Sequence, residues 1–435
     1  MSYIDDLQTV FGRVDDIIDY RISLSERRGI SLGIRDNDVG SVYSPFAYGH
    51  TTGGNFLVQW RDGRLSRGNL DGNSLANIEQ VLQVARQAAY DDPDAAQFLG
   101  PQTVHEVPLW SADIPPLFQE RSSVLFEVVA RLQAIAGRYT ARTLNGGVGA
   151  SLGRHWLRTS RGLALETPST SFGCSAVFDG LIGESLAQRT LPAMEAIDAQ
   201  LAGAGEYLRA LRQSAPALPR AQRLVVLHPR VAYSLWSFFV WGNLNGAAIF
   251  HGQSPFRIED FHAQRQVFAD DLTVRVDPWQ PLGIASFRYT AEGLPSQPTV
   301  YIEHGHLRQP ILDLKYARRL GLPPTTPPGG AESVLFETER VTEWSALRAT
   351  LDQALLVLGV LGLHTQDRSS GNFSLATSQA LLVRDGEFVG RARATLAGNF
   401  FDLLRDPLLR WVRFANQHSP GLALMLPLAI ESDAR

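Results

Sequence analysis

Apolar and polar positions follow two periodicities along the chain, one typical of helices and one typical of strands. Helical spacing covers residues 3–20. Strict alternation over residues 20–34 then predicts a strand, a turn at residues 26–29 and a second strand. Asp62 and Gly63 separate two further apolar runs, which predicts a hairpin. Ser74 is the expected N-cap of the helix that follows.

In the middle of the chain we predict a proline-rich connection at 101–116, a helix at 117–135 and antiparallel strands at 146–178. A second helix at 191–211 and a linker at 214–219 follow. The last part is richer in strands. There we expect strands at 223–227, 274–276, 285–289 and 299–303, a loop at 325–330, an apolar segment at 351–361, and a hairpin of 379–383 with 388–389 around Asp385 and Gly386.

The most apolar helix candidate lies within residues 231–256. Its apolar side chains run nearly all round the helix, which predicts burial. We expect the helix to end near residues 243–246, where Asn and Gly suit a left-handed cap. It is too short to span a bilayer. A buried helix that opens into a polar turn is a natural place for a functional site.

Taken together, helices mixed with mainly antiparallel strands predict an α+β fold. No internal repeat is found. The connections divide the chain into an N-terminal α+β domain, a middle α+β domain with its linker, and a C-terminal domain, at residues 1–100, 101–219 and 220–435.

Composition narrows the possible partners and compartment. A formal net charge of -4 argues against nucleic acid, because a phosphate-binding surface needs a basic excess. Asp5 and Asp6 stand where a signal peptide would be basic, and no apolar run reaches membrane-spanning length, so we predict a soluble cytoplasmic protein. Lys315 is the only lysine; this preference for Arg is a weak indication of a GC-rich source.

Few residues suggest chemistry of their own. The single cysteine, Cys174, lies in an apolar stretch and is interpreted as a buried structural thiol. No HExxH, nucleophile elbow, Walker A or dinucleotide fingerprint occurs. His304 and His306 have strand spacing, for which a solvated strand end is favoured over metal ligation.

The densest polar cluster is the Gly-bounded segment 362–375, GLHTQDRSSGNFSL. It brings His364, Gln366, Asp367 and Asn372 into one loop directly after an apolar run. The loop is either a binding loop, with these four residues near a substrate or a subunit interface, or a turn that bonds only to itself.

Four blocks of the chain resemble the TldD/PmbA family, and particularly its TldE (PmbA) branch. They are GLHTQDRSSGNFSL at 362–375, RDGEFVGRARATLAGNFFDLL at 384–404, AEGLPSQPTVYIEHGHL at 291–307 and DLKYARRLGLPPT at 313–325. The resemblance implies a two-lobed α+β fold. It also implies an assembly in which a TldD-like subunit carries zinc on a His-Glu-x-x-x-His helix and pairs with a TldE-like subunit that lacks it. Such a pair acts as a metallopeptidase on small or unfolded peptides.

The zinc helix of the family falls on residues 231–256. Matching its ending to residues 243–246 places Ser237, Phe238 and Gly242 where His, Glu and His would stand. Phe238 cannot act as a base, Gly242 has no ligand, and Ser237 alone would bind zinc poorly. The family's C-terminal cysteine ligand is missing as well, since no cysteine follows Cys174. We therefore predict no catalytic residue, metal or cofactor in this chain, and zinc in its partner.

Three hypotheses for function follow. The first is a non-catalytic TldE-like subunit of a heteromeric zinc metallopeptidase that processes small or unfolded peptides. The second keeps the metal-dependent complex but assigns it the cleavage of a bond in a small natural-product intermediate, because fold does not fix substrate. The third is a homomeric peptide-binding or scaffold protein. Whether this chain counts as an enzyme is left open.

Overall fold

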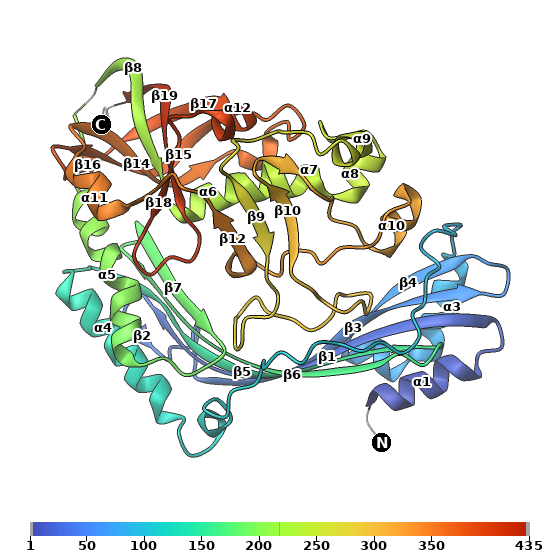
Figure 1. The fold of residues 1–435 in the computed structure, drawn as a ribbon. Helices are drawn as coiled ribbons and strands as arrows, with labels where there is room; N and C mark the ends of the chain where they lie inside the picture. The colour runs from blue at the N-terminus through green and yellow to red at the C-terminus, as the bar shows by residue number, and fades with distance from the viewer. Residues whose placement is uncertain (1–2, 217, 432–435) are drawn as a thin grey trace.

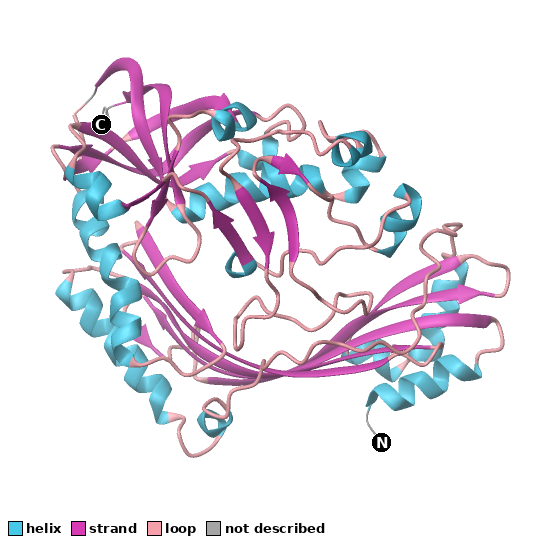
Figure 2. Cartoon of the chain, viewed as in Figure 1, coloured by secondary structure: helices cyan, strands magenta, loops and turns pink. Residues whose placement is uncertain are grey.

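The computed structural model of the chain describes residues 3–216 and 218–431. Residue 217, within the linker predicted at 214–219, lies outside the described residues. The chain forms two lobes, a long curved sheet backed by helices and a C-terminal lobe seated above it (Figure 1). Helices, strands and loops are interspersed throughout (Figure 2), and the predicted α+β class with mainly antiparallel sheets is confirmed.

One antiparallel sheet forms the N-terminal lobe, in the order β4-β3-β1-β5-β6-β7, with β2 paired to β1. Its strands are β1 (Ile17–Arg35), β2 (Asp38–Val39), β3 (Ala47–Trp60), β4 (Leu65–Leu70), β5 (Leu144–Thr159), β6 (Ala164–Phe178) and β7 (Ile182–Gln188). Strands from residues 1–100 and from residues 101–219 thus lie in the same sheet.

The turn predicted at residues 26–29 is wrong, because β1 is one continuous strand of 19 residues. Arg28 pairs with His50 of β3 on one side and with Leu152 of β5 on the other. Hydrogen bonding to two long neighbours satisfies the backbone through this segment and outweighs the local turn propensity of Gly29. The predicted hairpin at Asp62 and Gly63 is confirmed, since β3 and β4 pair antiparallel across it.

Helices cover opposite ends of one face of this sheet. They are α1 (Tyr3–Arg13), α2 (Gly72–Ala76), α3 (Ile78–Gln87), α4 (Ser123–Arg138) and α5 (Met194–Leu211). α1 and α3 share an apolar core with β1 and β3, whereas α4 and α5 pack on the other end. The expected N-cap was one turn too late. Asp71 caps α2 by accepting from the backbone N–H groups of Asn73 and Ser74, and Ser74 occupies the third helical position.

The C-terminal lobe is built around a sheet in the order β13-β18-β19-β17-β15-β14-β8. Its strands are β8 (Leu218–Leu227), β13 (Val341–Glu343), β14 (Gln353–Leu361), β15 (Asn372–Arg384), β16 (Glu387–Arg391), β17 (Arg393–Asn399), β18 (Arg410–Arg413) and β19 (Gly421–Glu431). β19 also pairs with β8, so strands β8, β14, β15, β17 and β19 close into a ring. The hairpin predicted around Asp385 and Gly386 is confirmed as β15 and β16.

A smaller sheet lies beside the ring, with strands β9 (Thr273–Val276), β10 (Thr299–Glu303), β11 (His306–Leu307) and β12 (Val334–Glu337). The strand predicted at residues 285–289 is wrong. Ser286 closes a turn there, because its backbone N–H donates to the carbonyl of Gly283 and its hydroxyl donates to that of Gln280. The Arg189 guanidinium donates to the carbonyl of Ser286 at 3.0 Å, whereas in a strand that carbonyl would accept from a neighbouring strand.

A central helical stretch runs through the C-terminal lobe as α6 (Pro229–Trp236), a π-helical turn η2 (Ser237–Trp241) and α7 (Gly242–Leu244). Shorter helices complete the lobe: α8 (Gly246–Phe250), α9 (Ile258–His262), α10 (Leu314–Leu320), α11 (Trp344–Ala349) and α12 (Phe400–Arg405). Trp236 and Phe239 are 2% and 0% exposed, which confirms the predicted burial of this stretch.

The left-handed cap expected at residues 243–246 is wrong. Asn245 is extended, with φ -66°, and its side chain accepts the N–H of Ala247 to begin α8. A β-carbon at Gly246 would come within 2.5 Å of the Leu312 side chain. The helix does end where predicted, since α7 stops at Leu244, but Asn245 and Gly246 begin α8 instead of forming a left-handed cap.

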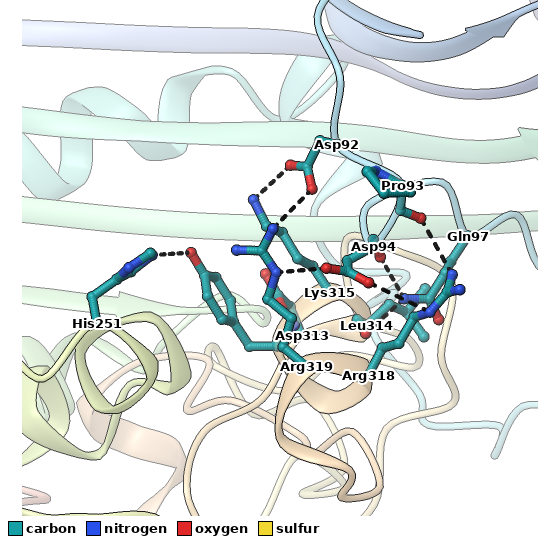
Figure 3. Close-up of polar contacts among 11 residues, drawn as sticks. Asp92, Pro93, Asp94, Gln97, His251, Asp313, Leu314, Lys315, Arg318 and Arg319 are labelled. Atoms are coloured by element: carbon teal, nitrogen blue, oxygen red, sulfur yellow. Dashed lines mark hydrogen bonds and ion pairs between the residues drawn. The ribbon is translucent and has the colours of Figure 1, made fainter. Parts of the chain in front are cut away.

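Ion pairs join the two lobes at α10 (Figure 3). The carboxylate of Asp92, from the segment after α3, lies 2.6 Å from Lys315 Nζ and 3.3 Å from an Arg319 nitrogen. Arg319 also bonds Asp94 at 2.8 Å. The only lysine of the chain therefore takes part in a partly buried contact between the lobes.

Among residues 3–216 and 218–431, no helix is both long and apolar enough to cross a membrane.

Candidate functional site

The central helical stretch and the predicted polar loop meet at Asn243. This side chain is fully buried, and its Nδ2 donates to the carbonyl of Phe239 at 2.9 Å and to that of Arg368 at 2.8 Å. The hydroxyl of Ser254 donates to the carbonyl of Asn243 at 2.8 Å. A single buried amide therefore ties loop 362–371 to the helix, although the two are far apart in sequence.

Arg368 extends from this anchored loop across the helix. Its Cζ lies 4.9 Å from the ring centroid of Phe238, a cation–π contact. A β-carbon at Gly242 would stand 2.7 Å from both Cδ and Nε of Arg368, so the absence of a side chain at Gly242 makes room for the arginine. The candidate site is the surface formed by Phe238, Gly242 and Arg368, which we call the helix–loop junction.

The loop residues predicted from sequence mostly bond to their own surroundings. Gln366 donates to the carbonyl of Gly362 at 2.9 Å and accepts the N–H of Ser374 at 2.9 Å. Asn372 Oδ1 accepts from the side-chain amide of Asn399 at 2.9 Å. These contacts are those of a self-bonded turn. A binding role for these residues stays a prediction.

Asp367 and His364 differ in how they are held. The hydroxyl and N–H of Ser369 donate to Asp367 Oδ1 at 2.7 and 2.9 Å, and these hydrogen bonds hold the pKa of Asp367 below its ordinary value. His364 is exposed in the short helix η4 (Leu363–Thr365), and its imidazole makes no hydrogen bond to any described residue. His364 is thus the predicted side chain most available to a ligand.

The three positions aligned with the zinc motif do not fit a metal. Ser237 is exposed, Phe238 packs under Arg368, and Gly242 faces the same guanidinium. In the described ranges, no three His, Cys, Asp or Glu side chains group closely enough to hold a metal ion. A fixed positive charge beside the aligned positions would also repel a divalent cation. That this chain carries no metal or cofactor stays a prediction, which metal analysis of the purified protein would test.

Two other sequence candidates have structural explanations. Cys174 is 4% exposed on the helix-covered face of the sheet, and burial raises the pKa of its thiol to about 11, which suits an inert thiol. His304 lies in a turn with φ 49°, and Nδ1 of His306 contacts its carbonyl oxygen at 2.6 Å. The two histidines therefore close a turn between β10 and β11.

A cavity of about 310 Å³ lies between α8, α10 and residues 290–294. Two carboxylates line it, and both are occupied. Glu292 accepts the N–H of Leu314 at 2.7 Å and lies 3.7 Å from Arg21, while Asp313 caps α10 by accepting the N–H of Tyr316. Burial raises the pKa of Glu292. These groups stabilise the contact between the lobes, and the cavity supplies no free polar group comparable to Arg368.

His228 is a buried titratable group at the start of α6. It is 2% exposed, contacts the rings of Tyr207 and Phe414, and its Nδ1 has no hydrogen-bond partner among the described residues. Burial, followed by the charge of Arg230, lowers the pKa of His228 to about 3. Its imidazole is therefore neutral in the folded protein.

We expect this histidine to make folding stability fall with acid. The unfolded chain takes up a proton below about pH 6.5 and the folded chain does not until about pH 3, so stability is present above that window and is lost as pH falls through it. At pH 5 the loss due to His228 is about 2 kcal/mol. Urea unfolding at pH 7 and pH 5 measures it.

The control for this prediction is His228→Phe, which keeps a ring against Phe414 without a titrating group. Glu184 acts in the opposite direction, because burial raises its pKa, and it is unchanged in both proteins. The variant should therefore lose less stability than the wild type between the two pH values. Equal losses would contradict the assignment to His228.

Sequence reasoning missed Arg368, which is part of the junction, and Asn243, which anchors the loop that carries it. Asn243 was assigned to a helix cap, yet a lone amide in an otherwise apolar helix is a signal for a buried hydrogen bond. Arg368 lies within the predicted polar loop, and no local feature of the sequence distinguishes it from its neighbours. Its contact with Phe238 joins segments 130 positions apart, which periodicity cannot reveal.

The fold and the junction together define a two-lobed α+β protein in which an arginine from a neighbouring loop packs across the buried helix, at the positions where metal ligands would stand. Residues 221–409 match the family model described as the PmbA/TldA metallopeptidase C-terminal domain. The match lies in the C-terminal part of the chain, which includes the four blocks that resemble the TldD/PmbA family.

Solved structures share the whole fold. Two candidate modulators of DNA gyrase superpose with TM-scores of 0.74 and 0.77: one from Thermotoga maritima (18% identity, 98% of this chain and 99% of that chain) and one from Bacteroides thetaiotaomicron (16%, 98% and 98%). TldE from Thermococcus kodakarensis has a TM-score of 0.74 at 17% identity, covering 99% of this chain and 100% of its own. At these identities the likeness shows the fold alone.

Two curated proteins are similar to the chain. A protein of uncharacterised function from Methanocaldococcus jannaschii is 23% identical over 339 residues, 76% of this chain and 78% of the relative. A metalloprotease PmbA homolog from Haemophilus influenzae is 27% identical over 166 residues, which is 37% of this chain and 36% of the relative.

Proposed function

We propose that this chain is the zinc-less, TldE-like subunit of a heteromeric metallopeptidase that processes small or unfolded peptides, with zinc held by a TldD-like partner. The observation that carries the proposal is the helix–loop junction. The family's C-terminal domain is retained, but Phe238 and Gly242 occupy the aligned motif positions and Arg368 packs across them. None of these side chains can hold zinc or activate water.

The N-terminal sheet offers a way to hold an extended peptide. β4 pairs with β3 only from Gly54 to Gln59, and in the described part of the chain no strand pairs with the same edge from Ala47 to Gly53. An open edge of this kind accepts an added strand through main-chain hydrogen bonds. This supports a role in substrate holding and leaves the bond cleavage to the partner. A cytoplasmic location is part of the proposal.

Metal analysis of the purified chain, alone and after co-expression with a TldD-like subunit from the same genome, tests the proposal. We expect no zinc and no peptidase activity in the isolated chain. The pair should form a stable complex, contain zinc and cleave unfolded peptides. Size measurement by light scattering and metal analysis by mass spectrometry give the two readouts.

The matched control is the same pair with the glutamate of the partner's zinc helix replaced by glutamine. Assembly should survive and activity should be lost, because the general base is removed while the ligands remain. Zinc-dependent peptidase activity in this chain alone would refute the proposal. A stable homomer that does not bind the TldD-like subunit would favour the scaffold hypothesis. A pair that contains zinc and cleaves a small molecule but no peptide would favour a small-molecule substrate.

A further inference from the structure

Arg368 is held in place from both ends. Its carbonyl oxygen is bound by the buried amide of Asn243 at 2.8 Å, which fixes the backbone. Its guanidinium rests on the ring of Phe238, with Cζ 4.9 Å from the ring centroid. A long cationic side chain normally loses considerable rotamer freedom when it binds a ligand. Here part of that loss has already occurred, so the group is preorganised.

The charge of Arg368 has no carboxylate partner within the described ranges, and its side-chain N–H groups donate to no described acceptor. The nearest acid in sequence, Asp367, is turned into its own loop by two hydrogen bonds from Ser369. Arg368 is also exposed. By contrast, Arg319 pairs with Asp94 and Arg340 with Asp271. The planar guanidinium of Arg368 therefore exposes N–H donors to solvent that no described residue accepts.

We propose that Arg368 binds a carboxylate of the peptide that this chain holds. The inference rests on the proposed function for the substrate class and adds the chemical group that is recognised. A guanidinium matches a carboxylate with two parallel N–H···O bonds. Phe238 covers one face of the guanidinium and supplies apolar surface beside it. Together they form a site for an acidic group flanked by an apolar side chain.

The absence of a side chain at Gly242 determines where the guanidinium of Arg368 can lie. A β-carbon there would lie 2.7 Å from Arg368 Cδ and Nε and 2.9 Å from Cζ. The clashing atoms belong to the outer part of a flexible side chain, so a Gly242→Ala change would move the guanidinium off Phe238 without removing its charge. Gly242 has ordinary helical dihedrals, with φ -61° and ψ -33°, so alanine fits the backbone.

Calorimetry with the full-length chain and three short peptides tests the proposal. The probes are acetyl-Ala-Ala-Phe with a free C-terminal carboxylate, the same peptide as its C-terminal amide, and acetyl-Ala-Glu-Phe-amide. We expect the wild type to bind the free acid about tenfold more tightly than the amide, as charge-assisted bonds provide. The third peptide identifies the source: binding equal to that of the free acid assigns a side-chain carboxylate, and weak binding assigns the C-terminus.

Three variants separate recognition from structure. Arg368→Gln should bind acid and amide equally, Arg368→Lys should keep part of the preference because it keeps charge but loses the fork, and Gly242→Ala should weaken the preference at unchanged or raised thermal stability. The preference would be reassigned if it survived in Arg368→Gln. Equal binding of all three peptides by the wild type, or no binding of any, would overturn the proposal.

This experiment is independent of the test of the proposed function. It uses the isolated chain and needs neither zinc nor a partner, so a failed assembly leaves its result unaffected. If Arg368→Gln instead loses pairing with the TldD-like subunit while the wild type shows no carboxylate preference, the arginine serves the subunit contact and the peptide assignment is wrong.

Discussion

Replacing Trp236 with alanine is expected to lower the free energy of unfolding by about 3–5 kcal/mol. The indole is 2% exposed and lies among the rings of Phe336, Trp241 and Trp411, with centroid distances of 4.9, 5.8 and 6.2 Å. Alanine would leave a cavity at the point where the central helical stretch meets both sheets of the lobe, and neighbours held by several contacts cannot collapse to fill it.

Urea unfolding followed by far-ultraviolet circular dichroism measures this loss. Two comparisons make it specific. Trp236→Phe keeps a ring and, because the indole Nε1 has no hydrogen-bond partner among described residues, loses only packing; we expect about 1–2 kcal/mol. Trp110→Ala removes an indole that is 41% exposed and should cost well under half as much as Trp236→Ala. Equal losses at the two tryptophans would show that burial is not the cause.

The second large effect is expected at Asn243. Asn243→Leu keeps the approximate volume but removes both donated hydrogen bonds, which leaves the carbonyls of Phe239 and Arg368 without this partner. We expect a loss of about 2–3 kcal/mol in the free energy of unfolding. The loss is limited because the amide oxygen of Asn243 is itself buried without a partner, and leucine removes that cost.

A local measurement distinguishes this loss from general damage. Hydrogen exchange in loop 362–371 should speed up in Asn243→Leu, because the tie between loop and helix is gone. Asn245→Ala is the matched control: it removes the cap of α8, for about 1 kcal/mol, and should leave exchange in the loop unchanged. Unchanged loop exchange in Asn243→Leu would show that the loop is held by other contacts.

Local chemistry explains which parts of the fold could be predicted from the sequence. Asp385 and Gly386 adopt φ of 50° and 75°, the left-handed pair that a tight hairpin requires, and the two residue types carry that preference themselves. The burial of the central helix could also be predicted, since Trp236 and Phe239 belong to an apolar run with no polar face.

Non-local pairing explains what could not be predicted. Gly29 carries a turn preference that two neighbouring strands override. Residues 285–289 alternate like a strand, but the carbonyls of Ser286 and Phe287 accept hydrogen bonds from the side chains of Arg189 and Ser296. Of the four residues proposed as a site, His364, Gln366 and Asp367 lie in the expected loop, whereas Asn372 begins β15. The residue that projects from it across the helix, Arg368, depends on a contact with Phe238 that only the folded chain creates.

The ring of strands in the C-terminal lobe has a consequence for synthesis of the protein. β8 begins at Leu218, yet the strand that closes the ring beside it, β19, ends at Glu431. β19 pairs with β8 from Leu422 to Ile430. While the ribosome is still making the intervening residues, one edge of β8 has no partner. The backbone N–H and C=O groups of that edge must wait for nearly the whole chain to emerge before β19 can pair with them. The N-terminal sheet can be complete by then, so this protein is expected to fold on the ribosome in two stages, with closure of the ring last.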